Sequence, residues 1–164
     1  MRVLSLLSLT SLIFGGAIFG FFYAWVCSTM WGLDAADPRL AIGAMQAMNA
    51  SVRNVVFAPA FFGTPAVMLL TGLVALRAGE KHAGFWFSGA AIIYLVFGLL
   101  LTMRFNVPMN RDLAQLVVPE DIETARAIWL DYSPRWQAFN IARTIASGLS
   151  LLMVGMGILT LSRR

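Results

Sequence analysis

The sequence is poor in charge, in cysteine and in histidine. Only 12% of its 164 residues are charged, whereas 59% are hydrophobic, and the mean hydropathy is +0.77. Soluble globular domains carry about 25% charged residues, so the composition excludes a water-soluble fold. It predicts an integral membrane protein that has the lipid bilayer as its main partner.

The single cysteine and the single histidine exclude several kinds of site. Cys27 has no second cysteine with which to form an intramolecular disulfide or a CxxC pair. His82 by itself cannot assemble a haem held by two histidines or a histidine-based metal site. Methionines near the outer loops could line a soft-metal site, although core packing is their commoner use. We expect no metal and no cofactor, and the scattered basic residues predict no nucleic-acid binding.

Four apolar runs are long enough to cross a membrane. A spanning helix needs about 20 mostly apolar residues, and residues 4–31, 55–76, 85–103 and 138–161 satisfy this requirement. The runs and their loops use the whole chain, without a linker or a detectable repeat. We therefore predict an all-α fold, a bundle of four transmembrane helices that forms a single domain over residues 1–164.

Two loops of the predicted bundle contain signals for short helices. In the first loop, Asp37 and Pro38 are typical of a helix N-cap followed by proline, and residues 40–50 favour helix. In the second loop, residues 119–131 form another helical stretch, which Pro134 is expected to end. We predict short helical caps over one end of the bundle.

The distribution of cations predicts the orientation in the membrane. The termini and the loop between the second and third runs carry five cations and one acid, Glu80. The opposite side carries seven cations and seven acids. Its raw cation count argues against a periplasmic location, but Arg53, Arg104 and Arg143 are discounted as buried site residues. We predict a bacterial inner-membrane protein with cytoplasmic termini and periplasmic long loops.

Polar residues gather where the third run ends. Residues 104–110 read Arg-Phe-Asn-Val-Pro-Met-Asn, which places Arg104, Asn106 and Asn110 beside hydrocarbon. Polar groups in such a place need partners and usually serve a functional site. We expect a polar pocket at the outer mouth of the bundle.

The fourth run carries a polar stripe. Trp136, Asn140, Arg143 and Ser147 follow the spacing i, i+4, i+7, i+11, which places them on one helical face. Arg143 lies about 10 Å along the axis from Trp136, deeper than the membrane interface. Its charge either faces an inward polar cluster, which the stripe shared with Asn140 favours, or snorkels outward to lipid headgroups.

Asn49 and Arg53 share the i, i+4 spacing ahead of the second run. They could face Arg104 and Arg143 across the mouth of the bundle. Three arginines without enough acid nearby would favour an anion such as a phenolate or an enolate, through planar hydrogen bonds. Alternatively, aspartates of the two loops neutralise the arginines in salt bridges, and the sequence fits both arrangements equally well. The aspartates concerned are Asp34, Asp112 and Asp131.

Together these residues resemble the anthrone-oxygenase-like family, small four-helix membrane proteins long labelled a domain of unknown function. The pattern is a glycine-rich first helix, Asn-xxx-Arg ahead of helix 2, Asn-Val-Pro-x-Asn after helix 3 and Trp-xxx-Asn-xx-Arg opening helix 4. The resemblance spans nearly the whole chain. The residues that carry it are Asn49, Arg53, Asn106, Val107, Pro108, Asn110, Trp136, Asn140 and Arg143.

The resemblance implies an oxygenase activity. Fungal members of the family oxidise anthrones to anthraquinones with molecular oxygen, without a dedicated metal or flavin, so O2 is the implied co-substrate. Such a protein must favour the substrate enolate and shield it from water.

The same resemblance implies roles for the polar residues. Arg143 and Arg104 would hold the enolate or phenolate oxygens, while Asn140 would orient the substrate. The implied substrate-binding residues are Asn49, Arg53, Asn106, Asn110 and Trp136. The general base is left open among Asp131, Asp112 and water.

A different class of function fits the same residues. The polar mouth could bind an apolar aromatic molecule, a quinone or a lipid without turnover. It could also be the assembly surface of a homo-oligomer or of an accessory membrane subunit. A transporter is disfavoured, because four spans are few and no inverted repeat is visible.

Overall fold

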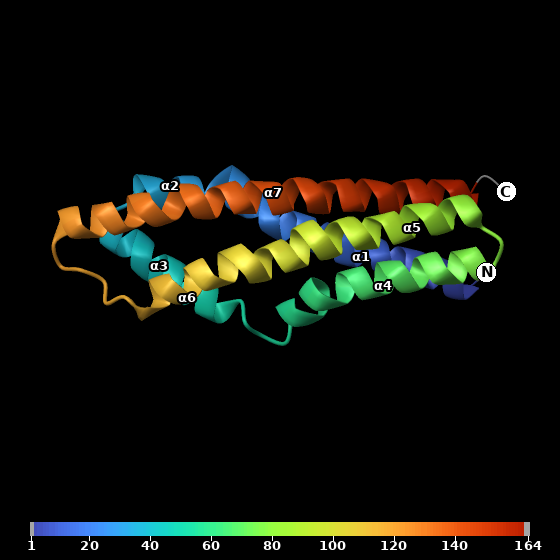
Figure 1. Cartoon of the computed structure of the whole chain (residues 1–164), viewed down its shortest axis with the longest axis horizontal. Helices are drawn as coiled ribbons and strands as arrows, with labels where there is room; N and C mark the ends of the chain where they lie inside the picture. Colours follow the sequence, from blue (N-terminus) through green and yellow to red (C-terminus); the bar gives the residue numbers. More distant parts are fainter. Residues whose placement is uncertain (1, 163–164) are drawn as a thin grey trace.

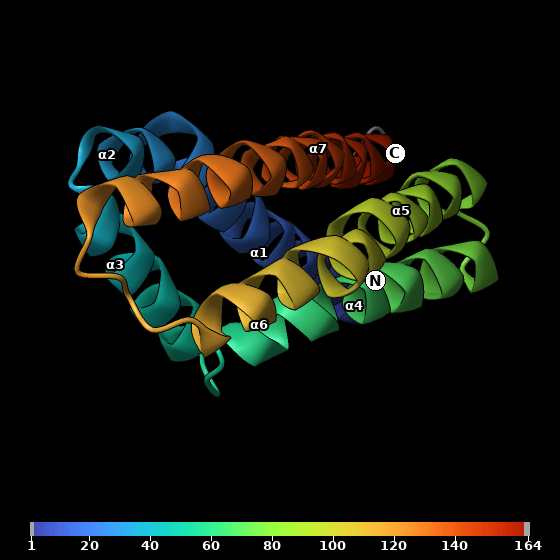
Figure 2. The ribbon, with the colours of Figure 1, turned by 60° about the vertical axis from the view of Figure 1, so that its left-hand side comes forward.

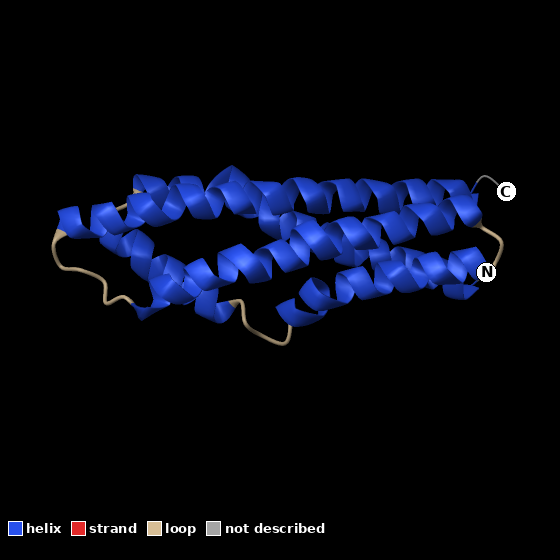
Figure 3. Ribbon diagram, in the orientation of Figure 1, coloured by secondary structure: helices blue, strands red, loops and turns tan. Residues whose placement is uncertain are grey.

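The computed structural model describes residues 2–162 and shows an elongated bundle of helices (Figure 1). The described chain contains no strand, and short loops connect its helices (Figure 3). Four helices are long and apolar enough to cross a membrane, at Arg2–Ala35, Phe57–Arg77, Lys81–Gln115 and Ile122–Leu161. The predicted all-α membrane fold is confirmed.

Several shorter segments make up these helices, and three of them are π-helical. The α-helices and the π-helices (η) are, in chain order, α1 (Arg2–Ala24), η1 (Trp25–Thr29), α2 (Met30–Ala35), α3 (Pro38–Ser51), α4 (Phe57–Arg77), α5 (Lys81–Ile93), η2 (Tyr94–Leu100), η3 (Thr102–Asn106), α6 (Val107–Gln115) and α7 (Ile122–Ser162).

The molecule has two halves along its long axis, with α4 and α5 towards one end and α2, α3 and α6 towards the other (Figures 1 and 2). α7 has 41 residues and runs through both. At 1.5 Å per residue it is about 60 Å long, roughly twice the thickness of bilayer hydrocarbon. Only part of α7 can therefore lie in the hydrocarbon.

We call the two parts the spanning half and the cap half. The spanning half comprises α1, α4, α5 and residues 138–161 of α7, and the cap half comprises η1, α2, α3, α6 and residues 122–137. The exposed side of α7 in the spanning half is apolar, as expected for a surface that contacts lipid. Its exposed residues include Ile141, Ile145, Leu149, Leu152, Met156 and Leu159.

The first predicted cap helix is present as α3. The carboxylate of Asp37 accepts a hydrogen bond from the backbone N–H of Arg39 at 2.9 Å, and Pro38 is the first helical residue. The helix ends at Ser51. Arg53 therefore lies in the turn that follows, and its predicted helical i, i+4 relation to Asn49 is wrong.

The second predicted cap helix does not end at Pro134. α7 continues through this residue from Ile122 to Ser162. Proline removes one backbone donor and usually kinks a helix. Here α2 packs along the same part of α7, since Ser133 Oγ donates to the carboxylate of Asp34 at 2.7 Å. The tertiary contact offsets the local preference, and the prediction of a break is wrong.

α4 and α5 approach each other closely at two glycines. A Cβ added to Gly72 would lie 3.0 Å from the backbone nitrogen of Ser88, and one added to Gly84 would lie 3.2 Å from the carbonyl oxygen of Gly72. Small residues let helix backbones pack closely in membranes. Nearby, the hydroxyl groups of Ser11 and Thr71 share a buried hydrogen bond of 2.9 Å that ties α1 to α4.

Candidate functional site

Arg143 lies buried between the two halves, with only 5% of its surface exposed. Trp136, Asn140 and Ser147 are buried on the same face of α7. The predicted polar stripe therefore points into the molecule. The inward orientation of Arg143 is confirmed, and snorkelling to lipid headgroups is excluded.

Polar atoms and aromatic rings hold the Arg143 guanidinium. Its Nε donates to Asn140 Oδ1 at 2.9 Å, and its Nη1 donates to Thr102 Oγ1 at 3.3 Å. Its Cζ lies 4.4 Å from the ring centroid of Phe22 and 5.0 Å from that of Trp136. Within residues 2–162, no carboxylate lies within 4.0 Å of it. A buried arginine without an acid is costly, so this position favours an anionic ligand.

Asn140 fixes the position of Arg143. Its Oδ1 accepts from the guanidinium, while its Nδ2 donates to the carbonyl oxygen of Phe22 at 3.2 Å. Both ends of the amide are used, which sets its orientation. The bond to Phe22 also joins α1 to α7 at the level of the site.

A second chain of hydrogen bonds is centred on Asn110 of α6. Its Oδ1 accepts from Trp136 Nε1 and from the hydroxyl group of Tyr132, each at 2.8 Å. Its Nδ2 donates to Asn49 Oδ1 at 2.9 Å. The chain links α3, α6 and α7 beside the polar stripe. Tyr132 was not among the predicted site residues, although it lies one helical turn before Trp136.

Two buried atoms next to these chains lack a partner. They are Asn49 Nδ2, a donor, and Asn106 Oδ1, an acceptor, which find no hydrogen-bond partner in the described part of the chain. The other end of the Asn106 amide makes only a long bond of 3.4 Å, to the carbonyl oxygen of Trp136. An unpaired buried polar group costs about 1–3 kcal/mol. A ligand with both a hydroxyl and a carbonyl group would satisfy the two atoms.

π-Helical segments border the site on two sides. Trp25 opens η1 directly beyond α1, and η3 carries Thr102 and Asn106, both of which are buried. Such bulges are frequent at functional sites. Nothing in the spacing of apolar residues distinguished them from ordinary α-helix, so sequence analysis missed them.

Arg104 and Arg53 do not join Arg143. Arg104 lies between Thr102 and Asn106 in the chain, and side chains two residues apart on a helix do not share a face. It is exposed, with its Cζ 5.3 Å from the ring centroid of Phe105. Arg53 is exposed in the turn after α3. The expected convergence of three arginines is therefore wrong.

The alternative, in which aspartates of the loops neutralise the arginines, does not hold for Arg143. Asp131 forms an exposed ion pair with Arg135 at 3.4 Å. Asp112 lines a surface hollow together with Arg104. Asp34 instead ties α2 to α7. Its carboxylate accepts from Trp129 Nε1 at 2.9 Å, Ser133 Oγ at 2.7 Å and Gln137 Nε2 at 2.8 Å.

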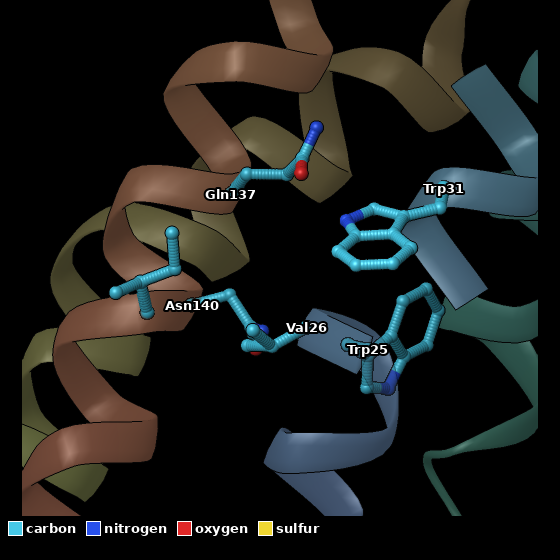
Figure 4. A pocket seen from close by; sticks show the side chains of 6 residues that line it. Trp25, Val26, Trp31, Gln137 and Asn140 are labelled. Atoms are coloured by element: carbon cyan, nitrogen blue, oxygen red, sulfur yellow. The ribbon is translucent and has the colours of Figure 1, made fainter. Parts of the chain in front are cut away.

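A cavity of about 210 Å³ lies beside Asn140, between the first helix and α7 (Figure 4). Asn140 connects it to the guanidinium of Arg143, because the same side chain lines the cavity and accepts the arginine hydrogen bond. Pockets for small molecules usually measure about 300–1,000 Å³, so a ligand of three fused rings requires some widening. The lining residues are Trp25, Val26, Trp31, Gln137, Asn140 and Ile141.

A second hollow, of about 480 Å³, lies between the end of the third span and α7. None of its lining residues is a hydrogen-bond or ring partner of Arg143. Among residues 2–162, no three His, Cys, Asp or Glu side chains are grouped to hold a metal ion. The hollow is lined by Arg104, Phe105, Pro108, Met109, Asp112, Arg135, Ala138 and Phe139.

Comparison with known proteins gives one match. The model of the anthrone oxygenase family matches residues 51–153, more than half of the chain. The matched segment contains Arg53 and the predicted site residues from Arg104 to Arg143, while Asn49 lies just ahead of it. No curated protein and no solved structure matches the chain.

Proposed function

Because the chain belongs to the anthrone oxygenase family, we propose that it oxidises a planar hydroxylated aromatic of the anthrone type with molecular oxygen. The reaction is placed beside Arg143, at the boundary between the spanning half and the cap half. One observation carries this placement. Within the described residues, a buried guanidinium without a carboxylate partner lies in the same polar cluster as two unpaired amide atoms, on Asn49 and Asn106.

The proposed reaction balances with O2 as the only oxidant. Removal of one proton from the methylene carbon of the anthrone gives an enolate. This carbanion equivalent forms a C–O bond with O2, which is reduced to a hydroperoxide. Loss of the second methylene proton with cleavage of the O–O bond leaves a carbonyl group and releases one water. The substrate has then lost two hydrogen atoms and gained one oxygen atom.

Arg143 is assigned the developing negative charge. A donor held in a buried, preorganised place stabilises an oxyanion far better than the same donor in water. Asn140 keeps the guanidinium in position, and the Phe22 and Trp136 rings hold its faces. Asn49 Nδ2 offers a further donor and Asn106 Oδ1 an acceptor for a phenolic hydroxyl group.

The first proton passes to water in this proposal. Asp131 and Asp112, the carboxylates considered as bases, are both on the surface. Asp34 is joined to the cavity through Gln137, but its oxygens already accept three hydrogen bonds. Stabilising the enolate, rather than supplying a strong base, is then the main catalytic contribution.

The test is oxygen consumption by the detergent-purified protein with 1,8-dihydroxyanthrone, together with the rise of anthraquinone absorbance. Wild type is compared with Arg143→Gln and with the uncatalysed autoxidation rate. The matched control is Arg126→Gln, because Arg126 lies on the same helix and makes only an exposed ion pair with Glu123. Activity above background in wild type and Arg126→Gln, and lost in Arg143→Gln, supports the proposal.

Arg104→Gln completes the comparison, because Arg104 was the other arginine predicted to hold the substrate. If activity depends on Arg104 and not on Arg143, the reaction lies in the second hollow and our placement is wrong. If folded wild type never exceeds autoxidation, the oxygenase assignment fails. A ligand-binding or accessory subunit is then the better description, and an Arg143→Gln variant that merely dissociates an oligomer would favour the accessory role.

We also propose that the protein lies in a bacterial inner membrane with the cap half on the periplasmic side. The nearly purely basic termini support this orientation. Two variants test this orientation in whole cells. They are Glu120→Cys and Lys81→Cys, each made in a Cys27→Ser background so that it carries a single cysteine. A membrane-impermeant maleimide should label Glu120→Cys and spare Lys81→Cys, and the reverse pattern would invert the topology.

A further inference from the structure

We propose that the cavity beside Asn140 is the entrance of the site for ligands that arrive from the membrane, and that Gln137 selects those with a free hydroxyl group. The cavity lies between two elements of the first helix, η1 and α2, and α7. The inference deepens the proposed function and rests on it for the planar aromatic nature of the ligand.

The cavity opens where the apolar surface of the spanning half ends. Trp31 and Ile141, at its rim, are 68% and 45% exposed. Tyr23 and Ile145 continue the same two helix surfaces towards the spanning half and are also exposed. An exposed tryptophan at the end of an apolar helix surface is typical of the membrane interface. A ligand dissolved in the bilayer could therefore reach the opening without crossing bulk water.

The cavity, and not the second hollow, leads to Arg143. Asn140 lines the cavity and accepts the hydrogen bond from Arg143 Nε. Trp25, a second lining residue, packs against Trp136 with ring centroids 5.0 Å apart. Trp136 in turn lies against the guanidinium. Two of the lining residues are thus in direct contact with the Arg143 cluster.

The walls of the cavity suit a flat ring with a polar edge. The indole rings of Trp25 and Trp31 approach from the first helix, and the amides of Gln137 and Asn140 approach from α7 (Figure 4). Aromatic rings favour offset or edge-to-face contact with another ring. Trp31 is the most exposed wall, so rotation of its side chain offers the widening that a ligand of three rings requires.

Gln137 presents only an acceptor to this space. Its Nε2 donates to Asp34 Oδ2 at 2.8 Å and to Ser133 Oγ at 2.9 Å, which uses both hydrogens. These bonds fix the amide so that its oxygen faces the cavity and its nitrogen points away (Figure 4). An acceptor can bind a hydroxyl group but not the corresponding methoxy group. Asp34 acts here as a positioning residue, because it holds Gln137 without lining the cavity.

Binding of a ligand pair that already has the oxidation state of the product tests this inference. The probes are 2,6-dihydroxyanthraquinone and 2,6-dimethoxyanthraquinone, whose substituents lie too far from the carbonyl groups to bond internally. Affinity is measured by quenching of tryptophan fluorescence in detergent-solubilised protein. Wild type should bind the dihydroxy compound about tenfold more tightly, the upper range for one neutral hydrogen bond.

Substitution at Gln137 should remove the discrimination rather than all binding. In Gln137→Leu the ratio of the two affinities should fall to about twofold or less, and Asp34→Asn should give an intermediate ratio. The matched control is Gln115→Leu, because Gln115 is exposed on α6. A ratio that stays at the wild-type value in folded Gln137→Leu overturns the role of Gln137.

Filling the opening tests the route independently of Gln137. Val26→Trp adds bulk to a wall of the cavity, and Ala138→Trp adds a large side chain to the second hollow. Val26→Trp should weaken binding of the dihydroxy compound by tenfold or more, about 1.4 kcal/mol, and Ala138→Trp should leave it unchanged. The opposite pattern overturns the entrance. Circular dichroism and gel filtration show which variants are folded, and affinities are compared only among folded variants.

The binding assay and the oxygen assay can fail separately. Selective binding that depends on Gln137, without oxygen uptake, supports the entrance and contradicts the oxygenase function. Oxygen uptake that depends on Arg143 but is unaffected in Val26→Trp supports the function and contradicts the entrance.

Discussion

The spanning half and the cap half are held together by different interactions. In the spanning half, buried apolar residues such as Met68, Phe87 and Val154 pack around glycine crossings. Most of its buried hydroxyl groups donate to backbone carbonyls, as Ser150 does to Ala90 at 2.9 Å. In the cap half, by contrast, side chains bond to one another across helices. There the carboxylate of Asp34 and the amide of Asn110 are the centres of the network.

The contrast follows from the different properties of lipid and water as surroundings for a helix bundle. Lipid provides no hydrophobic force between helices, so close backbone contact and small residues hold the spanning half. Beyond the hydrocarbon, water restores the hydrophobic effect, and aromatic and methionine side chains form the core of the cap half, including Met45, Trp129 and Tyr132. Arg143 lies where the two meet, and its partners come from both sides. The cap half therefore covers the charge of Arg143, which would be strongly destabilising if the side chain faced lipid.

The largest effect is expected at this boundary. Arg143→Met should lower the oxygenase rate by about 10²- to 10³-fold, because it removes the donor for the enolate. It should leave the melting temperature equal or higher, since an apolar side chain replaces a buried charge without an acid. Oxygen uptake and thermal unfolding on the same preparation check this. A large fall in melting temperature would mean that Arg143 is structural.

The next largest effect is expected when the hydrogen-bond chain centred on Asn110 is broken. Asn110→Ala would leave Trp136 Nε1, the Tyr132 hydroxyl group and the Asn49 amide without their shared partner. We expect destabilisation of about 3 kcal/mol, because each unpaired buried group costs about 1–3 kcal/mol and the gap admits some water. Hydrogen exchange should rise in α3 and α6 and stay unchanged in α4 and α5. Faster exchange of equal size in both halves would contradict the conclusion that separate interactions hold each half.

A destabilising substitution in the spanning half should raise hydrogen exchange there and leave the cap half unaffected. Gly72→Val forces side-chain atoms against the backbone of α5, and overpacking of this kind costs about 1–3 kcal/mol. Faster exchange is expected in α4 and α5, with α3 unaffected. Gly16→Val is the matched control, because a Cβ there meets nothing within 4 Å. Equal destabilisation by both variants would mean that the glycine crossing has no special role.

The smallest effect concerns the first turn of α3. Hydrogen bonds from the guanidinium and the backbone N–H of Arg39 lower the pKa of the Asp37 carboxyl group from 3.8 to about 2. The ionised cap therefore contributes fully above about pH 4, and its contribution is lost as the pH falls through about 2. Asp37→Ala should remove this acid-dependent loss of helicity. Far-UV circular dichroism between pH 2 and 6 measures it, and an unchanged acid transition in the variant would exclude Asp37 as its origin.

Helical periodicity was a sound guide where the lipid environment dictates the pattern. Run length predicted the four apolar helices, and Asp37 with Pro38 predicted the start of α3. Helical periodicity placed Trp136, Asn140 and Arg143 on one face, which lies inward. It failed for Arg53 and Arg104, because their positions depend on where α3 ends and on which face of η3 turns inward. It also missed Gln137, whose role depends on Asp34, far away in the chain.

The sequence by itself determined a membrane protein of four apolar helices with a polar stripe on the fourth, because apolar runs of this length are stable in lipid when each helix pairs its own backbone groups. Only the tertiary structure decided that Arg143 faces inward without an acid partner among residues 2–162, that Arg104 faces a separate hollow, and that α7 continues through Pro134. Those outcomes depend on contacts between residues distant in the chain, such as Asp34 with Ser133 and Asn110 with Asn49, and no local pattern encodes them.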